Sequence, residues 1–269
     1  MTKFTKMHGA GNDYIYVYTP DNPIADPSAK SIEWSRPHFG VGSDGLILIG
    51  KSEKPEADFT MNIYNNDGSE AMMCGNGVRC VGKFVYDHHL TDKTTIAIDT
   101  LSGIKIITLR IEDGICTGAT VDMGEPLLNN TQQCATPDGS LNNEQGTYVC
   151  MGNPHFVTFV EDSTKSDVAG EGKKLEFDPL FPERCNIEFA TIRPDGSIRM
   201  RVWERGSGIT MACGTGACAT AVAACVRGLT GRESDIEMDG GTLHIEWRES
   251  DNHIYMTGPA ATAFEGVIE

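Results

Sequence analysis

Two cysteines of this chain stand in the same short pattern, Cys-Gly-x-Gly, at residues 74–77 and 213–216. Each cysteine comes nine positions after the end of a β-like run and opens a stretch typical of a helix. A thiol at the start of a helix faces unpaired backbone N–H groups and the positive end of the helix dipole, which predicts a lowered pKa for Cys74 and Cys213. The glycines allow close backbone approach, so the same N–H groups are expected to hold a carboxylate.

Two such thiols on opposite faces of one α-carbon would form a two-base device. One thiolate removes the α-proton while the opposite thiol donates another, and the centre is inverted. Enzymes often ease the removal of so weakly acidic a proton with an electron-sink cofactor. The sequence has no evident pyridoxal-phosphate signature, so we expect no cofactor and a dry site whose fixed donors stabilise the carbanion.

Other polar residues near these turns are candidates for the same site. Asn12 and Asn153 each follow a glycine and precede a strand, where a side-chain amide can orient a thiol or a substrate. His155 and Glu204 are expected to help deprotonate a thiol, and Arg205 to form a forked ion pair with a second carboxylate. As isolated residues they have simpler interpretations, since asparagines form turns and a Glu-Arg pair can be a solvated strand end.

The chain also contains an internal repeat. FTMNIYNNDGSEAMMCGNG (59–77) aligns without gaps on IRMRVWERGSGITMACGTG (198–216), at the offset of 139 residues that separates Cys74 from Cys213. GNDYIYVY (11–18) and GNPHFVTF (152–159) match at an offset of 141. Two similarly spaced matches predict a duplicated unit. If the halves pack about a pseudo-twofold axis, the two turns face each other across a cleft.

The elements that must hold these turns are mostly strands. β-Branched and aromatic runs predict strands at 14–18, 45–50, 59–64, 95–99, 104–111, 155–160, 186–192, 197–203, 242–247 and 253–258. Helices are expected at 77–90 and 216–228, and the second is so apolar that protein should surround it. Segment 161–185 is expected to be a surface excursion and segment 131–147 a polar loop.

Composition excludes several classes of protein. A net charge of −16 argues against a nucleic-acid partner, which would require clustered Lys and Arg. Neither a signal peptide nor an apolar run of membrane-spanning length is found, so we expect a cytoplasmic protein without a membrane partner. Nine cysteines without a CxxC pair predict free thiols and no metal site.

Five motifs resemble those of the diaminopimelate epimerase family. They are HGAGNDY (8–14), NNDGSEAMMCGNGVRC (65–80), MGNPHF (151–156), ERCN (183–186) and ERGSGITMACGTGACAT (204–220). The resemblance covers nearly the whole chain. It implies an α+β fold of two pseudo-symmetric domains, each a curved, mostly antiparallel sheet wrapped around a central helix, with the active site in the interdomain cleft. We expect one domain at 1–118 plus 259–269 and the other at 119–258.

The resemblance also implies the activity and the site. The family interconverts LL- and meso-diaminopimelate without a cofactor, in the synthesis of lysine and peptidoglycan precursors. It implies Cys74 and Cys213 as the catalytic acid/base pair, with His155 and Glu204 assisting the thiols. The substrate-binding positions carried over are Asn12, Asn65, Gly75, Asn76, Asn153, Asn186, Glu204, Arg205, Gly214 and Thr215. Many members carry Gln where this chain has Gly45, so a backbone contact is expected there.

Three other functions remain as alternatives. Proline and hydroxyproline racemases also pair two cysteines, but they typically carry His after the first Cys-Gly and Ser-Pro before the second Cys, where this chain has Asn76 and Met211-Ala212. Phenazine-biosynthesis-type isomerases share the fold but lack the cysteine pair. A redox sensor or small-ligand binding protein could use facing thiols as a disulfide switch. The oligomeric state stays open, with a homodimer as one possibility.

Overall fold

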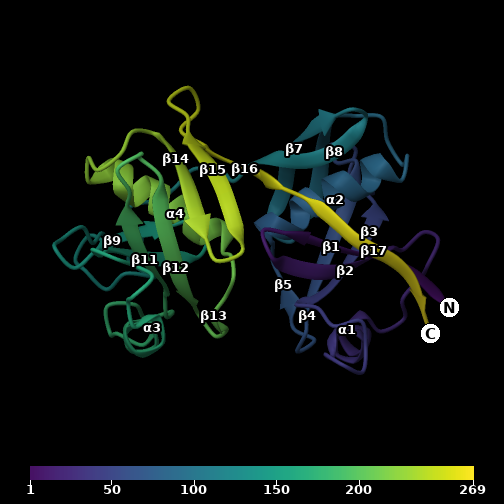
Figure 1. The fold of residues 1–269 in the computed structure, drawn as a ribbon, viewed down its shortest axis with the longest axis horizontal. Helices are drawn as coiled ribbons and strands as arrows, with labels where there is room; N and C mark the ends of the chain where they lie inside the picture. Colours follow the sequence, from purple (N-terminus) through teal and green to yellow (C-terminus); the bar gives the residue numbers. More distant parts are fainter. The chain divides into compact units, whose positions relative to one another are not determined.

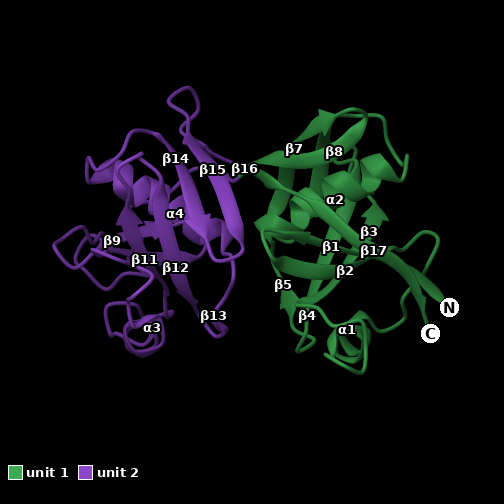
Figure 2. Ribbon diagram, viewed as in Figure 1, with its two compact units in different colours: residues 1–122, 257–269 green, residues 123–256 purple.

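The chain divides into two compact units (Figure 2). A computed structural model describes all 269 residues. Unit 1 comprises Met1–Asp122 and Thr257–Glu269, and unit 2 comprises Met123–Met256. No helix in either unit combines the length and the apolar character needed to cross a membrane.

Unit 1 is a mixed sheet with two helices (Figure 1). Its elements are β1 (Thr2–Gly9), β2 (Asn12–Tyr18), α1 (Pro27–Ser35), β3 (Gly45–Lys51), β4 (Phe59–Asn65), β5 (Glu70–Ala71), α2 (Gly75–Asp87), β6 (Thr95–Thr100), β7 (Gly103–Glu112), β8 (Ile115–Asp122) and β17 (Ala261–Ile268). β1 pairs antiparallel with both β2 and β17, while β2 runs parallel to β3. β4 pairs antiparallel with β3 and parallel with β6, and β6, β7 and β8 follow as antiparallel neighbours.

Unit 2 repeats this arrangement. Its elements are β9 (Thr147–Cys150), β10 (Pro154–Phe159), α3 (Val168–Glu176), β11 (Asn186–Ile192), β12 (Ile198–Glu204), β13 (Gly208–Ile209), α4 (Gly214–Val226), β14 (Glu233–Met238) and β15 (Gly241–Trp247), and β16 (Ile254–Pro259) leads back into unit 1. β10 runs parallel to β11, β11 antiparallel to β12, β12 parallel to β14, and β14 antiparallel to β15. The same senses of pairing link β2, β3, β4, β6 and β7 in unit 1.

A buried helix lies at the centre of each unit. All residues of α2 from Gly75 to Val85 are buried, and the helix packs against β1, β2, β7 and β8. In α4, every residue from Gly216 to Ala224 is buried, and the helix packs against strands β9 to β12, β14 and β15. The α+β fold and the prediction that protein surrounds the second helix are therefore confirmed. Each unit adds two parallel strand pairs to its otherwise antiparallel sheet.

The two peripheral helices were not predicted. α1 begins after Asp26, whose carboxylate accepts the N–H of Ala29, and proline occupies its first turn. α3 lies inside the segment expected to be a surface excursion, and Asp167 caps it through the N–H of Gly170. Both helices are nine residues long and present only a narrow apolar face, so their hydrophobic periodicity is weak.

Candidate active site

Cys74 caps the N-terminus of the central helix of unit 1. Its sulfur accepts the backbone N–H of Gly77 at 3.3 Å, and its thiol donates to Oδ1 of Asn12 at 3.2 Å. Gly75 and Asn76 form the first helical turn behind it. The sulfur is therefore held at the positive end of the helix, as the sequence pattern predicts.

The amide of Asn12 is oriented by the carboxylate of Asp44. Asn12 donates Nδ2 to Oδ2 of Asp44 at 2.7 Å, and the backbone N–H of Asp13 donates to the same oxygen at 3.0 Å. Because its NH₂ group is engaged in this way, Asn12 presents its oxygen to the thiol of Cys74. Burial raises the pKa of Asp44, while the bonds from Asp13 and Asn12 oppose that rise.

Cys213 occupies the same place in unit 2. It caps α4, its sulfur accepts the N–H of Gly216 at 3.4 Å, and the hydroxyl of Thr215 lies 3.6 Å from it. It is only 5% exposed. The carboxylate charge of Glu204 raises the pKa of this thiol, and the carboxyl group accepts a hydrogen bond from the hydroxyl of Thr210. Glu204 thus reaches the thiol that the sequence analysis assigned it to assist.

A buried chain of polar groups runs beside Cys213. Asn153 donates Nδ2 to the hydroxyl of Thr215 at 3.4 Å, and its Oδ1 lies 3.1 Å from Nε2 of His155. Nδ1 of His155 lies 2.6 Å from Oε1 of Glu188. Both His155 and Glu188 are fully buried, and Oε2 of Glu188 has no hydrogen-bond partner. This histidine is fixed in orientation at both ring nitrogens.

The prediction that both thiols have a lowered pKa is wrong for this structure. Burial raises the pKa of Cys74, and the bond from the Gly77 N–H and the charge of Arg79 offset only part of that rise. Burial, followed by the carboxylates of Glu204 and Glu188, holds the pKa of Cys213 well above its ordinary value. Desolvation of the thiolate therefore outweighs the helix terminus at both positions.

Asn186 and Arg205 are linked to each other and to neighbouring backbone groups by hydrogen bonds. Asn186 is buried, donates to the carbonyl of Pro154 at 2.8 Å and accepts the backbone N–H of Arg205 at 2.9 Å. Its amide therefore positions Arg205. Nη1 of Arg205 donates to the carbonyl of Glu183 at 2.9 Å, and the side chain remains partly exposed.

The remaining predicted residues lie at the ends of the same elements. Asn65 ends β4 and donates to the hydroxyl of Ser69 at 3.0 Å, while Gly214 and Thr215 open α4. The structure thus gathers Asn12, Gly75 and Asn76 around Cys74, and Asn153, His155, Glu204, Gly214 and Thr215 around Cys213. Asn65, Asn186 and Arg205 form no hydrogen bond with either sulfur, and their substrate-binding role stays a prediction.

Gly45 has a packing role in this chain. A Cβ atom there would lie 2.2 Å from the carbonyl oxygen of Tyr64 and 3.0 Å from Cα of Asn65. The carbonyl of Gly45 accepts the hydroxyl of Ser43 at 2.9 Å. A glutamine side chain is therefore excluded here by backbone atoms unless strand β4 moves.

Three residues near the thiols were not predicted: Tyr14, Asp44 and Glu188. Tyr14 lies in the motif HGAGNDY (8–14), and Asp44 lies in the segment FGVGSDGLI (39–47). These motifs could therefore have indicated that both residues lie near the site. Glu188 lies within the strand NIEFATI, where an acidic residue normally indicates a solvent-facing position. No group of three His, Cys, Asp or Glu side chains is arranged to hold a metal ion.

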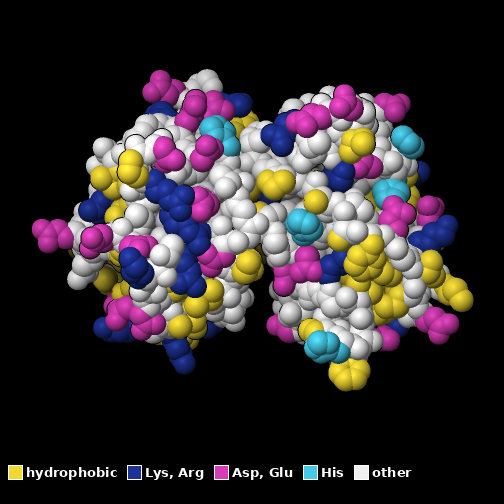
Figure 3. All heavy atoms as spheres, viewed as in Figure 1, with side chains coloured by type: hydrophobic (Ala, Val, Ile, Leu, Met, Phe, Trp, Pro, Cys, Tyr) yellow, Lys and Arg dark blue, Asp and Glu magenta, His cyan; other side chains and the backbone are white.

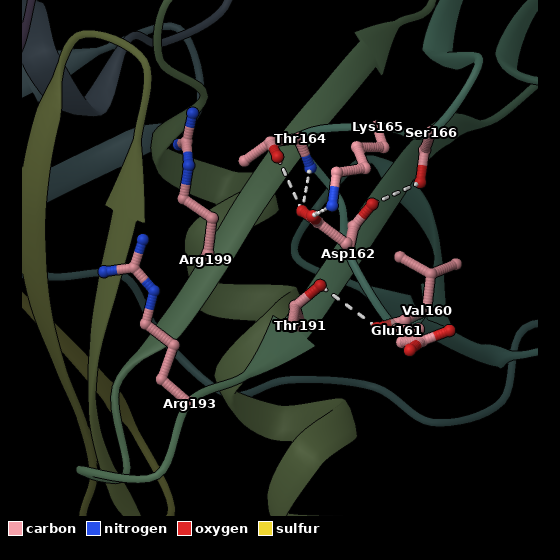
Figure 4. A pocket seen from close by; sticks show the side chains of 9 residues that line it. All are labelled: Val160, Glu161, Asp162, Thr164, Lys165, Ser166, Thr191, Arg193 and Arg199. Atoms are coloured by element: carbon pink, nitrogen blue, oxygen red, sulfur yellow. Dashed lines mark hydrogen bonds and ion pairs between the residues drawn. The ribbon is translucent and has the colours of Figure 1, made fainter.

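A separate hollow on unit 2 is lined by nine residues, including Asp162, Lys165, Arg193 and Arg199 (Figure 4). Figure 4 shows Lys165 turned onto Asp162, while the two arginines extend side by side. These arginines already pair with Glu237 and Asp239, respectively. Lys and Arg side chains also gather on one face of unit 2 (Figure 3). Since the cations that line the hollow are matched by acidic groups, the hollow is not a strong anion site.

Several solved structures share this fold. The chain aligns over 99% of its length, and 90% of the other chain, with a hydroxyproline epimerase from Agrobacterium vitis, at a TM-score of 0.73 and 14% identity. It aligns over its full length with a phenazine biosynthesis protein of the PhzF family from Bacillus anthracis, covering 99% of that chain at a TM-score of 0.71 and 15% identity. The chain thus has the fold of these proteins, with a thiol capping the central helix of each unit.

The particular family follows from sequence. The model of the diaminopimelate epimerase family matches residues 4–128 and 147–263. Diaminopimelate epimerases from Bacteroides thetaiotaomicron and Phocaeicola vulgatus are 61% and 59% identical, each over 99% of this chain and 98% of the relative. One from Methanococcus maripaludis is 48% identical over 99% of both chains. This chain belongs to the diaminopimelate epimerase family.

Proposed function

We propose that this protein epimerises LL-diaminopimelate to meso-diaminopimelate by a two-base mechanism, with Cys74 and Cys213 as the bases. The observation that carries the proposal is the repeated cap: each sulfur accepts an N–H from the fourth residue of its own Cys-Gly-x-Gly turn, at 3.3 and 3.4 Å. The product would serve lysine and peptidoglycan-precursor synthesis. We place the enzyme in the cytoplasm, and a homodimer stays a prediction.

The proton balance requires one thiolate and one thiol. The thiolate takes the α-proton and becomes a thiol, while the opposite thiol delivers its proton to the other face and becomes a thiolate. Configuration inverts, no redox change occurs, and the enzyme is left with its two protonation states exchanged. The reverse reaction then uses the same two groups in exchanged roles.

Burial of the thiols suits this chemistry. A desolvated thiolate is a stronger base than a hydrated one, and the α-proton of an amino acid is only weakly acidic. The backbone N–H groups at Gly75, Asn76, Gly214 and Thr215 lie at helix starts, where negative charge is favoured. We assign them to the α-carboxylate of the substrate, which would also stabilise the charge that develops on deprotonation.

The surrounding polar groups have different tasks. Glu204 lies close enough to Cys213 for its charge to raise the pKa of the thiol, and we assign it to accept or return the proton of that thiol. His155, fixed between Asn153 and Glu188, is the second group that assists this thiol. Arg205 and Asn186, which are linked by a hydrogen bond in unit 2, are assigned with Asn65 of unit 1 to the distal amino-carboxylate end of the substrate.

The test is isotope exchange in heavy water under reducing conditions. The wild-type protein should introduce one α-deuterium into LL-diaminopimelate and convert it to the meso isomer, as read by mass spectrometry and chiral chromatography. Cys74→Ser and Cys213→Ser should each lower the rate of epimerisation at least about 10²-fold, because each removes a general acid or base. Cys225→Ser is the matched control, since this partly exposed cysteine lies at the far end of α4.

Two results would overturn the proposal. One is a wild-type protein that neither exchanges the α-hydrogen nor converts the isomer while its thiols are reduced. The other is a single cysteine variant that epimerises at the rate of Cys225→Ser, because a two-base reaction cannot proceed at full rate with one base missing.

A further inference from the structure

Three side chains of strand β2 with polar end groups face the start of helix α2. Alternate residues of a strand share a face, so Asn12, Tyr14 and Tyr16 point the same way. Asn12 accepts the thiol of Cys74 at 3.2 Å, and the hydroxyl of Tyr16 donates to the carbonyl of Gly77 at 3.4 Å. Tyr14 lies between them on the same face of the strand, and its hydroxyl interacts with Cys74 and lowers the pKa of that thiol.

The ring of Tyr14 has little freedom to leave this position. The residue is 6% exposed, and its Cε1 atom lies 3.0 Å from the point where a Cβ of Gly45 would be. A buried ring held against backbone on one side can place its hydroxyl reproducibly. Burial also holds the pKa of Tyr14 well above its ordinary value, so the hydroxyl keeps its proton and can serve as a donor.

The internal repeat gives this tyrosine a counterpart. Tyr14 follows Gly11-Asn12 as His155 follows Gly152-Asn153. Tyr14 stands opposite Gly45 in the parallel pair β2–β3, and His155 stands opposite Asn186 in the parallel pair β10–β11. The position that carries a thiol-assisting histidine in unit 2 therefore carries a phenol in unit 1.

We propose that Tyr14 is a positioning residue for Cys74, whose hydroxyl donates a hydrogen bond to the Cys74 thiolate and holds it in line for proton transfer. This inference rests on the proposed function of Cys74 as a catalytic base. Tyr14 acts through the sulfur and needs no contact with the substrate.

Other charged and titratable groups lie near Cys74 or near the residues that contact it. From α2, the charge of Arg79 lowers the pKa of Cys74, and Cys80 lies close enough to interact with it. From β2, the buried phenol of Tyr16 also interacts with Cys74. Asp44 acts on Asn12 and Tyr14. None of these groups is altered by removing the hydroxyl of Tyr14.

The experiment measures alkylation of Cys74 by iodoacetamide against pH. It uses Cys213→Ser protein with and without Tyr14→Phe, and peptide mass mapping assigns the label to Cys74. Loss of a charge-assisted donor should lower the labelling rate about tenfold at a fixed pH and shift the profile about one unit upward. Tyr16→Phe is the matched control, because it removes a neighbouring hydroxyl that binds the Gly77 carbonyl, and should leave the profile in place.

Steady-state kinetics of Tyr14→Phe with an intact Cys213 give a second readout. The turnover number should fall and the acid limb of its pH profile should move upward, while KM stays near the wild-type value. An unchanged Cys74 labelling profile, or a fall explained by KM alone, would overturn the inference. Failure of the proposed function looks different, because then the wild-type protein itself exchanges no α-deuterium, whatever the labelling profile of Cys74.

Discussion

Replacement of Gly45 by alanine tests how tightly the strands behind the thiol of unit 1 are packed. The added Cβ would lie 2.2 Å from the carbonyl oxygen of Tyr64 and 3.0 Å from Cε1 of Tyr14. The nearest atom is backbone of a central strand, so no side-chain rotation relieves the contact and β4 must shift by about 1 Å to restore van der Waals distance. Overpacking of this kind costs about 1–3 kcal/mol.

This cost is large enough to measure by thermal unfolding. At about 2–4 °C per kcal/mol for a protein of this size, a loss of about 2 kcal/mol lowers Tm by about 4–8 °C. Gly45→Gln should lose at least as much. Calorimetry of both variants against the wild type gives the comparison.

The matched control is Gly231→Ala. A Cβ at Gly231 meets nothing within 4 Å, and its φ is not left-handed. Alanine there should raise stability slightly, by about 0.4–1 kcal/mol, through the unfolded state. If Gly45→Ala proved as stable as Gly231→Ala, the close approach of β3 and β4 would be refuted, and with it the argument that this position cannot hold a side chain.

Three further perturbations address the thiols themselves. Burial raises the pKa of both thiols, and two carboxylates raise the pKa of Cys213 further. Iodoacetamide should therefore label Cys74 at a lower pH than Cys213. The reverse order would contradict the effect assigned to the two carboxylates. Glu188→Gln should lower kcat about tenfold with little change in KM, because His155 loses a charge-assisted bond of 2.6 Å; unchanged kcat would remove Glu188 from the site. Gly216→Ala should lower kcat, because its Cβ would lie 2.8 Å from Oε1 of Glu188 and displace that carboxylate. It should not lower Tm, because alanine favours the helix. An unaltered kcat would show that the site tolerates a displaced Glu188.

The repeat made the scaffold predictable from sequence. Two alignments without gaps indicated a duplicated unit, and the strand pairings of β10, β11, β12 and β14 repeat those of β2, β3, β4 and β6. The central helices were predicted to start two residues late, since they begin at Gly75 and Gly214, and to end late as well, since they end at Asp87 and Val226. Glycine is a poor helix former, so the residue pattern alone predicted each helix to start at the last glycine of its Cys-Gly-x-Gly turn.

Elements at the edges were harder to predict. β1 and β17 contain mixed polar and apolar residues, and their pairing joins the two ends of the sequence. Local alternation carries little information about such a distant partner. α1 and α3 depend on a capping aspartate and tertiary packing, and a short helix with a narrow apolar face has no strong period.

The candidate site was predictable where chemistry repeats and was missed where the halves diverge. Glu188 corresponds by the 141-residue offset to Ile47, so comparison of the halves hides it. Its contact with His155 crosses between strands β10 and β11. The thiol pKa was predicted in the wrong direction because a sequence pattern shows the helix start but not how completely the sulfur is removed from water.

Duplication has kept the backbone frame of the two thiols while their charged surroundings have changed. Beside Cys74 the helix carries the buried cation Arg79, where α4 has Cys218. Beside Cys213 stand the carboxyl groups of Glu188 and Glu204. A cation favours the thiolate and a carboxylate favours the thiol, so the resting enzyme should hold its protons unequally. A two-base epimerisation needs one thiolate and one thiol at the outset. Because the backbone around the two sulfurs is the same and the nearby charges differ, the enzyme should reach this protonation state before the substrate binds.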